Sequence, residues 1–96
     1  MSEASQSIRQ EVFFSGRVQG VGFRYTTNRI AADFKVSGRV RNLPDGRVHL
    51  VVEGVVDEIA EFVAAIEERM GAYIRHVDRT RKSEATGEYQ DFGIDV

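Results

Sequence analysis

The sequence predicts an α+β fold in which one antiparallel sheet is covered on one face by two helices. Segments that alternate apolar and polar residues predict the strands, and two segments with apolar residues at helical spacing lie between them. The chain has 96 residues, of which 42% are hydrophobic. That length suffices for one core and is too short for two, so we expect a single layered domain.

The first strand is expected to follow a polar tail. Residues 1–10 are rich in Ser, Gln and Glu, and we interpret them as a flexible N-terminal tail that precedes a domain over residues 11–96. Apolar residues then alternate with other residues at Val12, Phe14 and Val18, which is typical of a strand with one buried face.

A helix is predicted where the apolar period changes. Phe23, Thr27, Ile30 and Phe34 are separated by four, three and four positions, so they form one stripe of a helix over about residues 22–34. A hairpin is predicted next, because turn residues separate two extended segments.

The second half of the pattern consists of this hairpin, a second helix and two strands. Gly38 begins the first extended segment, the letters LPDG at 43–46 predict the turn, and residues 47–53 form the second strand. Strands are also predicted over residues 73–84 and 92–96. The helix, expected over 56–70 with Gly71 as its cap, has apolar residues at Ile59, Phe62, Val63, Ile66 and Met70.

The resulting order is βαββαβ with a final short β, which predicts a ferredoxin-like sandwich. Both crossovers in such a chain should be right-handed, and this rule leaves few other topologies. We expect the face of the sheet opposite the helices to be exposed to solvent.

Composition and charge exclude several classes of function. The chain has no cysteine, which excludes a disulfide framework, a thiolate nucleophile and a Cys-based zinc site. His49 and His76 lack ligand spacing, so we expect no metal and no cofactor. A net charge of −2 argues against general attraction to nucleic acid or anionic lipid. No segment is long and apolar enough to span a bilayer, and we expect a cytoplasmic monomer.

The most informative segment is GRVQGVGFR at residues 16–24, which predicts an anion-binding loop. Two glycines let successive backbone amides converge, and the helix that follows adds its unpaired N–H groups and positive dipole end. Arg24 adds a planar cation suited to phosphate oxygens. The loop residues expected to bind phosphate are Gln19, Gly20, Val21, Gly22, Phe23 and Arg24. Alternatively, the glycines serve only a tight turn and Arg24 is solvated.

Asn42 is expected at the same end of the fold as Arg24. A helix from residue 24 to 35 descends roughly 17 Å, and a strand from 38 to 42 rises back roughly 13 Å. A side-chain amide beside a bound phosphate could orient a water molecule. Alternatively, Asn42 is a turn residue that bonds the loop at 43–46.

Two segments together resemble the acylphosphatase family: GRVQGVGFR at 16–24 and GRVRNLPDGRV at 38–48. The resemblance implies an enzyme that hydrolyses the carboxyl–phosphate anhydride of small acyl phosphates without a metal or a covalent intermediate. It further implies that Arg24 and Asn42 are catalytic, that the amides from Gln19 to Arg24 hold the phosphate, and that Asn42 positions the attacking water.

Three residues depart from the pattern of that family. Lys35 stands where a glycine usually ends the first helix, Arg39 replaces a large aromatic residue, and Ala72 replaces a proline. We expect these differences to bear on stability and substrate access, since both predicted catalytic residues are present.

Two other functions stay open at the level of sequence. An RNA-binding module can share this architecture, but it needs aromatic residues on its central strands, and the strand at 47–53 has none. A noncatalytic domain could bind phosphate-bearing metabolites through the same loop. Arg39, Arg41 and Arg47 could form a basic patch, although charged residues are also common on strand edges.

Overall fold

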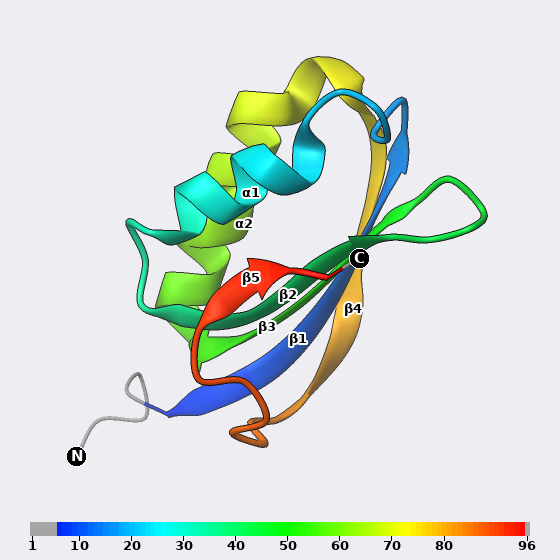
Figure 1. The fold of residues 1–96 in the computed structure, drawn as a ribbon. Helices are drawn as coiled ribbons and strands as arrows, with labels where there is room; N and C mark the ends of the chain where they lie inside the picture. Colours follow the sequence, from blue (N-terminus) through cyan, green and yellow to red (C-terminus); the bar gives the residue numbers. More distant parts are fainter. Residues whose placement is uncertain (1–5, 96) are drawn as a thin grey trace.

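The computed structural model describes residues 6–95 and shows a five-stranded sheet with both helices on one face (Figure 1). The strand order is β4-β1-β3-β2-β5. In chain order the elements are β1 (Ser7–Gly16), α1 (Phe23–Ala31), β2 (Val36–Asn42), β3 (Val48–Val55), α2 (Val56–Met70), the 3₁₀ turn η2 (Gly71–Tyr73), β4 (Ile74–Glu84) and β5 (Phe92–Ile94).

The ferredoxin-like prediction is confirmed by this order and by the strand pairing. β1 pairs antiparallel with both β3 and β4, and β2 pairs antiparallel with β3 across the predicted hairpin. The short closing strand differs in direction, because β5 runs parallel to β2, with Ile94 opposite Val40. The sheet is therefore mixed, and its last strand lies beside the strand that carries Asn42.

β1 begins earlier than expected. Residues 7–10 fall in the predicted flexible tail, and the structure corrects this by pairing them with β3 and β4. Polar composition was misleading because Gln10 is only 5% exposed and its side-chain amide donates to the Arg79 carbonyl at 2.6 Å. Residues 1–5 lie outside the described part of the chain, so the tail stays a prediction there.

The core lies between the helices and the inner face of the sheet. It contains the residues predicted from alternation in β1 and from helical spacing in both helices: Val12, Phe14, Val18, Phe23, Ile30, Ile59, Phe62, Val63, Ile66 and Met70. The Phe34 and Phe62 rings pack at 5.7 Å between their centroids. Neither helix within residues 6–95 is long and apolar enough to cross a membrane.

α1 is shorter than predicted and ends at Ala31 rather than Phe34. The next three amides, including that of Phe34, donate to carbonyls three positions back, so the chain leaves the helix through a tighter turn. No described residue other than glycine has a positive φ. Lys35 therefore needs no left-handed cap, and its backbone N–H donates to the Glu58 carboxylate at 2.8 Å.

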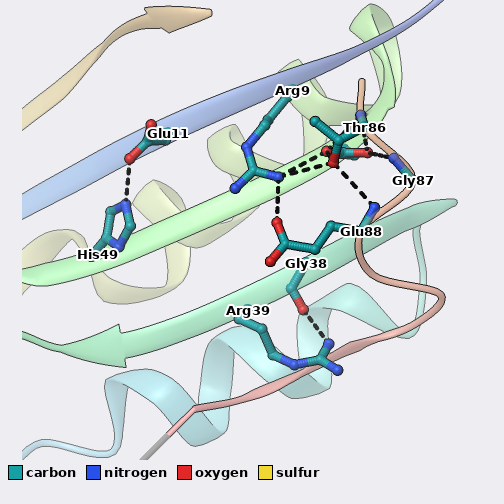
Figure 2. A network of polar contacts seen from close by, with 9 residues as sticks. Arg9, Glu11, Gly38, Arg39, His49, Thr86, Gly87 and Glu88 are labelled. Carbon is teal, nitrogen blue, oxygen red and sulfur yellow. Dashed lines mark hydrogen bonds and ion pairs between the residues drawn. The ribbon is translucent and has the colours of Figure 1, made fainter. Parts of the chain in front are cut away.

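The sheet face opposite the helices is partly covered, which corrects the expectation that solvent reaches all of it. His49 is 8% exposed, and Val51 and Glu53 are each 5% exposed, although all three point to this outer face. Long polar side chains and the segment after β4 cover them (Figure 2). Phe13 lies on this face as well and stacks on His49 at 4.6 Å, whereas Phe14 is in the core.

Candidate active site

The loop between β1 and α1 has a backbone that only glycine adopts readily. Gly20 and Gly22 have φ values of 79° and 77°. A Cβ atom added at either position would meet nothing within 4 Å, so their backbone conformation, and not a lack of space, favours glycine there. The loop thus takes the bend that the sequence predicted.

The N-terminus of α1 is open to an anion. Gly22 is the N-cap residue and provides no side-chain cap, and the described first turn contains no acidic residue. The first amides of a helix lack partners within it, and the positive end of the helix dipole lies at the same point. This end of α1 can therefore stabilise a phosphate.

A cavity of about 240 Å³ joins the loop, α1 and the end of β2. Five residues predicted at the site line it: Gly20, Gly22, Phe23, Arg24 and Asn42. The structure therefore brings Arg24 and Asn42 to one cavity, although they lie on different elements. None of the ion pairs among residues 6–95 involves Arg24, so no described carboxylate neutralises its charge.

Two predicted loop residues do not line this cavity. Val21 packs against the hydrophobic core. The side-chain amide of Gln19 donates to the carbonyls of Leu43 at 2.8 Å and Arg47 at 2.9 Å. Gln19 therefore ties the glycine loop to the β2–β3 turn, and its side chain is occupied by that contact.

The β2–β3 turn is closed by residues other than Asn42. The Leu43 N–H donates to the Arg47 carbonyl at 2.8 Å, and the Asp45 carboxylate accepts from the Arg47 backbone at 3.1 Å. Asn42 makes no side-chain hydrogen bond to the residues of this described turn. Its carboxamide is thus available at the cavity, which weakens the alternative that it is a turn residue.

Three residues of the cavity wall were not among the predicted site residues: Val18, which was predicted only as a buried strand residue, Tyr25 and Ile94. Tyr25 follows Arg24 but lies outside the apolar stripe of α1, and it is 60% exposed. Ile94 was recognised as part of a strand, yet its position at the cavity depends on the parallel pairing of β5 with β2. In the sequence, only the position of Tyr25 directly after Arg24 could have indicated that one of these residues lies at the cavity.

On the outer face, the Glu53 carboxylate anchors the segment after β4. It accepts from the Thr86 hydroxyl at 2.7 Å, the Gly87 backbone at 2.9 Å and the Arg9 guanidinium at 3.0 Å. The same guanidinium nitrogen pairs with Glu88 at 3.0 Å (Figure 2). Burial alone would raise the pKa of Glu53, but these hydrogen bonds outweigh it and lower the pKa to about 2.

His49 lies between two charged neighbours on the same face. Its Nδ1 accepts from the Arg41 guanidinium at 3.2 Å, so Nε2 carries the ring proton. Nε2 then donates to the Glu11 carboxylate, with 2.8 Å between nitrogen and oxygen (Figure 2). Burial lowers the pKa of His49, and the charge of Arg41 lowers it further against the opposing hydrogen bond to Glu11. The neutral ring is the favoured form.

The three arginines of the hairpin are engaged in separate contacts and do not form one free patch. Arg39 pairs with Asp91 at 3.1 Å and lies 4.7 Å from the Tyr89 ring. Arg47 pairs with Asp45 at 2.8 Å. Arg39 stands in β2 where the family pattern has a large aromatic residue. Tyr89, from the segment between β4 and β5, places an aromatic ring beside it. Ala72, the third departure, is exposed in η2.

The site has no evident set of metal ligands. Among residues 6–95, no three His, Cys, Asp or Glu side chains gather closely enough to hold an ion. The polar groups at the cavity are backbone amides, a guanidinium and a carboxamide. Such donors suit an oxyanion.

A family model for acylphosphatase matches residues 10–94. The chain belongs to the acylphosphatase family. The match confirms the resemblance that the two glycine-containing segments indicated, and it covers every element that lines the cavity.

Individual proteins of the acylphosphatase family agree with this assignment. An acylphosphatase of Nostoc sp. is 58% identical over 59 residues, which are 62% of this chain and 58% of that protein. The chain thus spans little more than half the length of that relative. An acylphosphatase of Thiobacillus denitrificans is 47% identical over 80% of this chain and 84% of its own. The crystal structure of acylphosphatase from Bacillus subtilis superposes with a TM-score of 0.82 at 30% identity, covering 93% of this chain and 99% of that one.

Proposed function

We propose that this chain hydrolyses the carboxyl–phosphate bond of small acyl phosphates to a carboxylate and inorganic phosphate. One observation carries the proposal: in a member of the acylphosphatase family, Arg24 and Asn42 line the same cavity as the glycine loop. Arg24 and Asn42 are the proposed catalytic residues. The chain would work as a cytoplasmic monomer without a metal, on the composition and charge described above.

The phosphoryl group would be held by the loop and by α1. Backbone amides between Gln19 and Arg24 would donate to its oxygens, and the Arg24 guanidinium would match its negative charge. Because Gly20 and Gly22 preset the backbone, these donors need little rearrangement when the substrate binds. Positioning and charge stabilisation are the main contributions that proteins make to phosphoryl transfer.

Asn42 would hold the attacking water. Its carboxamide oxygen can accept a hydrogen bond from the water, which leaves an oxygen lone pair directed at phosphorus. As the new P–O bond forms, the bond between phosphorus and the acyl oxygen breaks, and its electron pair leaves with the carboxylate. A substrate phosphate oxygen would take the proton from the water, because the cavity lining offers no carboxylate or imidazole.

No general acid is needed for the leaving group. A carboxylic acid has a pKa of about 4, so its anion departs at neutral pH without protonation. The residues at the cavity can therefore support this hydrolysis without a general acid. A reaction that expels a strongly basic group would need one.

The alternative of a noncatalytic phosphate-binding domain has the same loop and differs only in the role of Asn42. The RNA-binding alternative is disfavoured by the outer face, where His49, Val51 and Glu53 are buried rather than presented to bases. RNA recognition motifs need exposed aromatic residues there.

Hydrolysis of benzoyl phosphate in the presence of a chelator tests the proposal. Arg24→Ala and Asn42→Ala should each lower kcat/KM by about 10²–10³-fold, as removal of an oxyanion donor does. Arg75→Ala, an exposed arginine of β4, and Asn28→Ala of α1 are matched controls outside the cavity. Phosphate binding without turnover would favour the noncatalytic alternative, and full activity in both site variants would contradict the assigned roles.

A further inference from the structure

We propose that Tyr25 and Ile94 form the acyl subsite of the cavity and make the enzyme prefer acyl phosphates with an aromatic or branched apolar acyl group over acetyl phosphate. This inference rests on the proposed function, since it concerns the part of the substrate that the phosphate loop does not hold.

The first support is the location of the exposed apolar side chains. Within residues 6–95, the large hydrophobic residues that are exposed are Tyr25, Val56, Tyr73 and Ile94. Two of these line the same cavity, together with Arg24 and Asn42. Exposed apolar side chains that gather at a polar site commonly mark the contact surface of a ligand.

The second support is that both residues belong to ordered elements of the backbone. Tyr25 is in the first turn of α1, and the Arg29 guanidinium lies 5.8 Å from its ring centroid. Ile94 is opposite Val40 in the parallel pair, and the next amide, of Asp95, donates to the Val40 carbonyl at 2.9 Å. Two different elements thus present an apolar wall at defined positions.

The third support is that the polar and the apolar residues of the cavity wall lie on different parts of it. Its polar donors belong to the loop and to Arg24 and Asn42, which would take the phosphoryl group and water. The cavity has a volume of about 240 Å³, below the roughly 300–1,000 Å³ of pockets for drug-sized ligands, as suits a small substrate. With the phosphoryl group at these donors, the acyl group would lie toward the exposed side chains of Tyr25 and Ile94.

Acyl phosphates also differ in the basicity of the carboxylate that leaves, so the contribution of the rim is the part of the preference that changes when Tyr25 or Ile94 is replaced. A few methylene groups in an apolar contact change kcat/KM ratios by about 10-fold or more. A phenyl ring covers more apolar surface than a methyl group, so benzoyl phosphate should gain most from the two side chains.

The test compares benzoyl phosphate with acetyl phosphate in the wild type and in Tyr25→Ala and Ile94→Ala. We expect the ratio of their kcat/KM values to fall about tenfold in each variant, and Tyr25→Phe to retain it. Tyr73→Ala and Val56→Ala are matched controls, since both residues are 40% exposed and lie outside the cavity. A ratio that is unchanged in both cavity variants would overturn the subsite.

Binding of nonhydrolysable analogues separates this inference from the proposed function. By calorimetry, the wild type should bind benzylphosphonate more tightly than methylphosphonate, and the difference should shrink in Tyr25→Ala and Ile94→Ala. If neither acyl phosphate is hydrolysed, the proposed function fails and the phosphonates still decide the subsite. Equal affinity for both phosphonates in the wild type would refute the subsite, whatever the activity.

Discussion

The side-chain amide of Gln19 donates to the carbonyl of Leu43 at 2.8 Å, and this bond joins the glycine loop to the hairpin that begins after Asn42. The same amide reaches Arg47 at 2.9 Å, so one side chain spans both ends of the β2–β3 turn. The two proposed catalytic residues are carried by the two segments that Gln19 connects. Gln19 is thus placed to hold Arg24 and Asn42 in register.

Replacing Gln19 should therefore impair activity more than stability. Gln19→Ala removes two hydrogen bonds, which should lower the free energy of unfolding by about 1–3 kcal/mol. Loss of alignment between Arg24 and Asn42 should lower kcat for benzoyl phosphate by up to about 10²-fold. Steady-state kinetics and urea denaturation measure the two effects. Gln90→Ala, an exposed glutamine, is the control, and full activity of Gln19→Ala would limit Gln19 to a structural role.

Substituting the loop glycines should cost stability through the backbone alone. At φ values near +78°, alanine is strained by about 1–2 kcal/mol, although neither Gly20 nor Gly22 has a neighbour that a Cβ would strike. Gly71 is the matched control, because it has equal space and a helical φ of −56°. Gly71→Ala should instead stabilise the protein by about 0.4–1 kcal/mol. Chemical denaturation of the three variants tests this, and equal effects would contradict it.

Acid should destabilise the protein through Glu53. Its folded pKa of about 2 lies below the ordinary 4.5, so the stabilisation is present above pH 4.5 and is lost as the pH falls from 4.5 toward 2. The shift corresponds to about 3 kcal/mol. Glu53→Gln should lose that amount at neutral pH and show a flatter decline in acid, measured by urea denaturation at several pH values. Glu61→Gln, which alters an exposed residue of α2, should behave like the wild type.

His49 should add a second pH dependence at higher pH. Because its folded pKa lies below 6.5, the unfolded chain binds more protons as the pH falls below 6.5, and the free energy of unfolding decreases until the folded pKa is reached. An NMR titration should place the His49 midpoint below 6.5, and Glu11→Gln should lower it further by removing the opposing contact. A midpoint above 6.5 would show that Glu11 outweighs burial.

Local patterns in the sequence predicted the inner half of the fold well. Apolar spacing located both helices and the buried faces of β1 and β3, because one side of each element packs against a single core. The lengths expected for the first helix and the strand after it also placed Arg24 and Asn42 at one end of the sheet, where they line one cavity.

Features that depend on distant parts of the chain could not be predicted in this way. Gln10 reads as a tail residue until the Arg79 carbonyl provides its partner. Glu53 reads as exposed until residues 86 and 87 fold over it. Ile94 lies at the cavity only because β5 runs parallel to β2. Each case needs a contact across many residues, which periodicity does not encode.

The strand order has a consequence for how copies of this protein meet at high concentration. A sheet grows from molecule to molecule through its outermost strands, which here are β4 and β5. β5 has only three residues, and β4 carries Arg75, Arg79, Arg81 and Lys82 against the acidic Asp78 and Glu84. One edge strand is too short to template another chain, and the other is rich in charged side chains with an excess of basic residues, so neither edge favours amyloid-like stacking of copies.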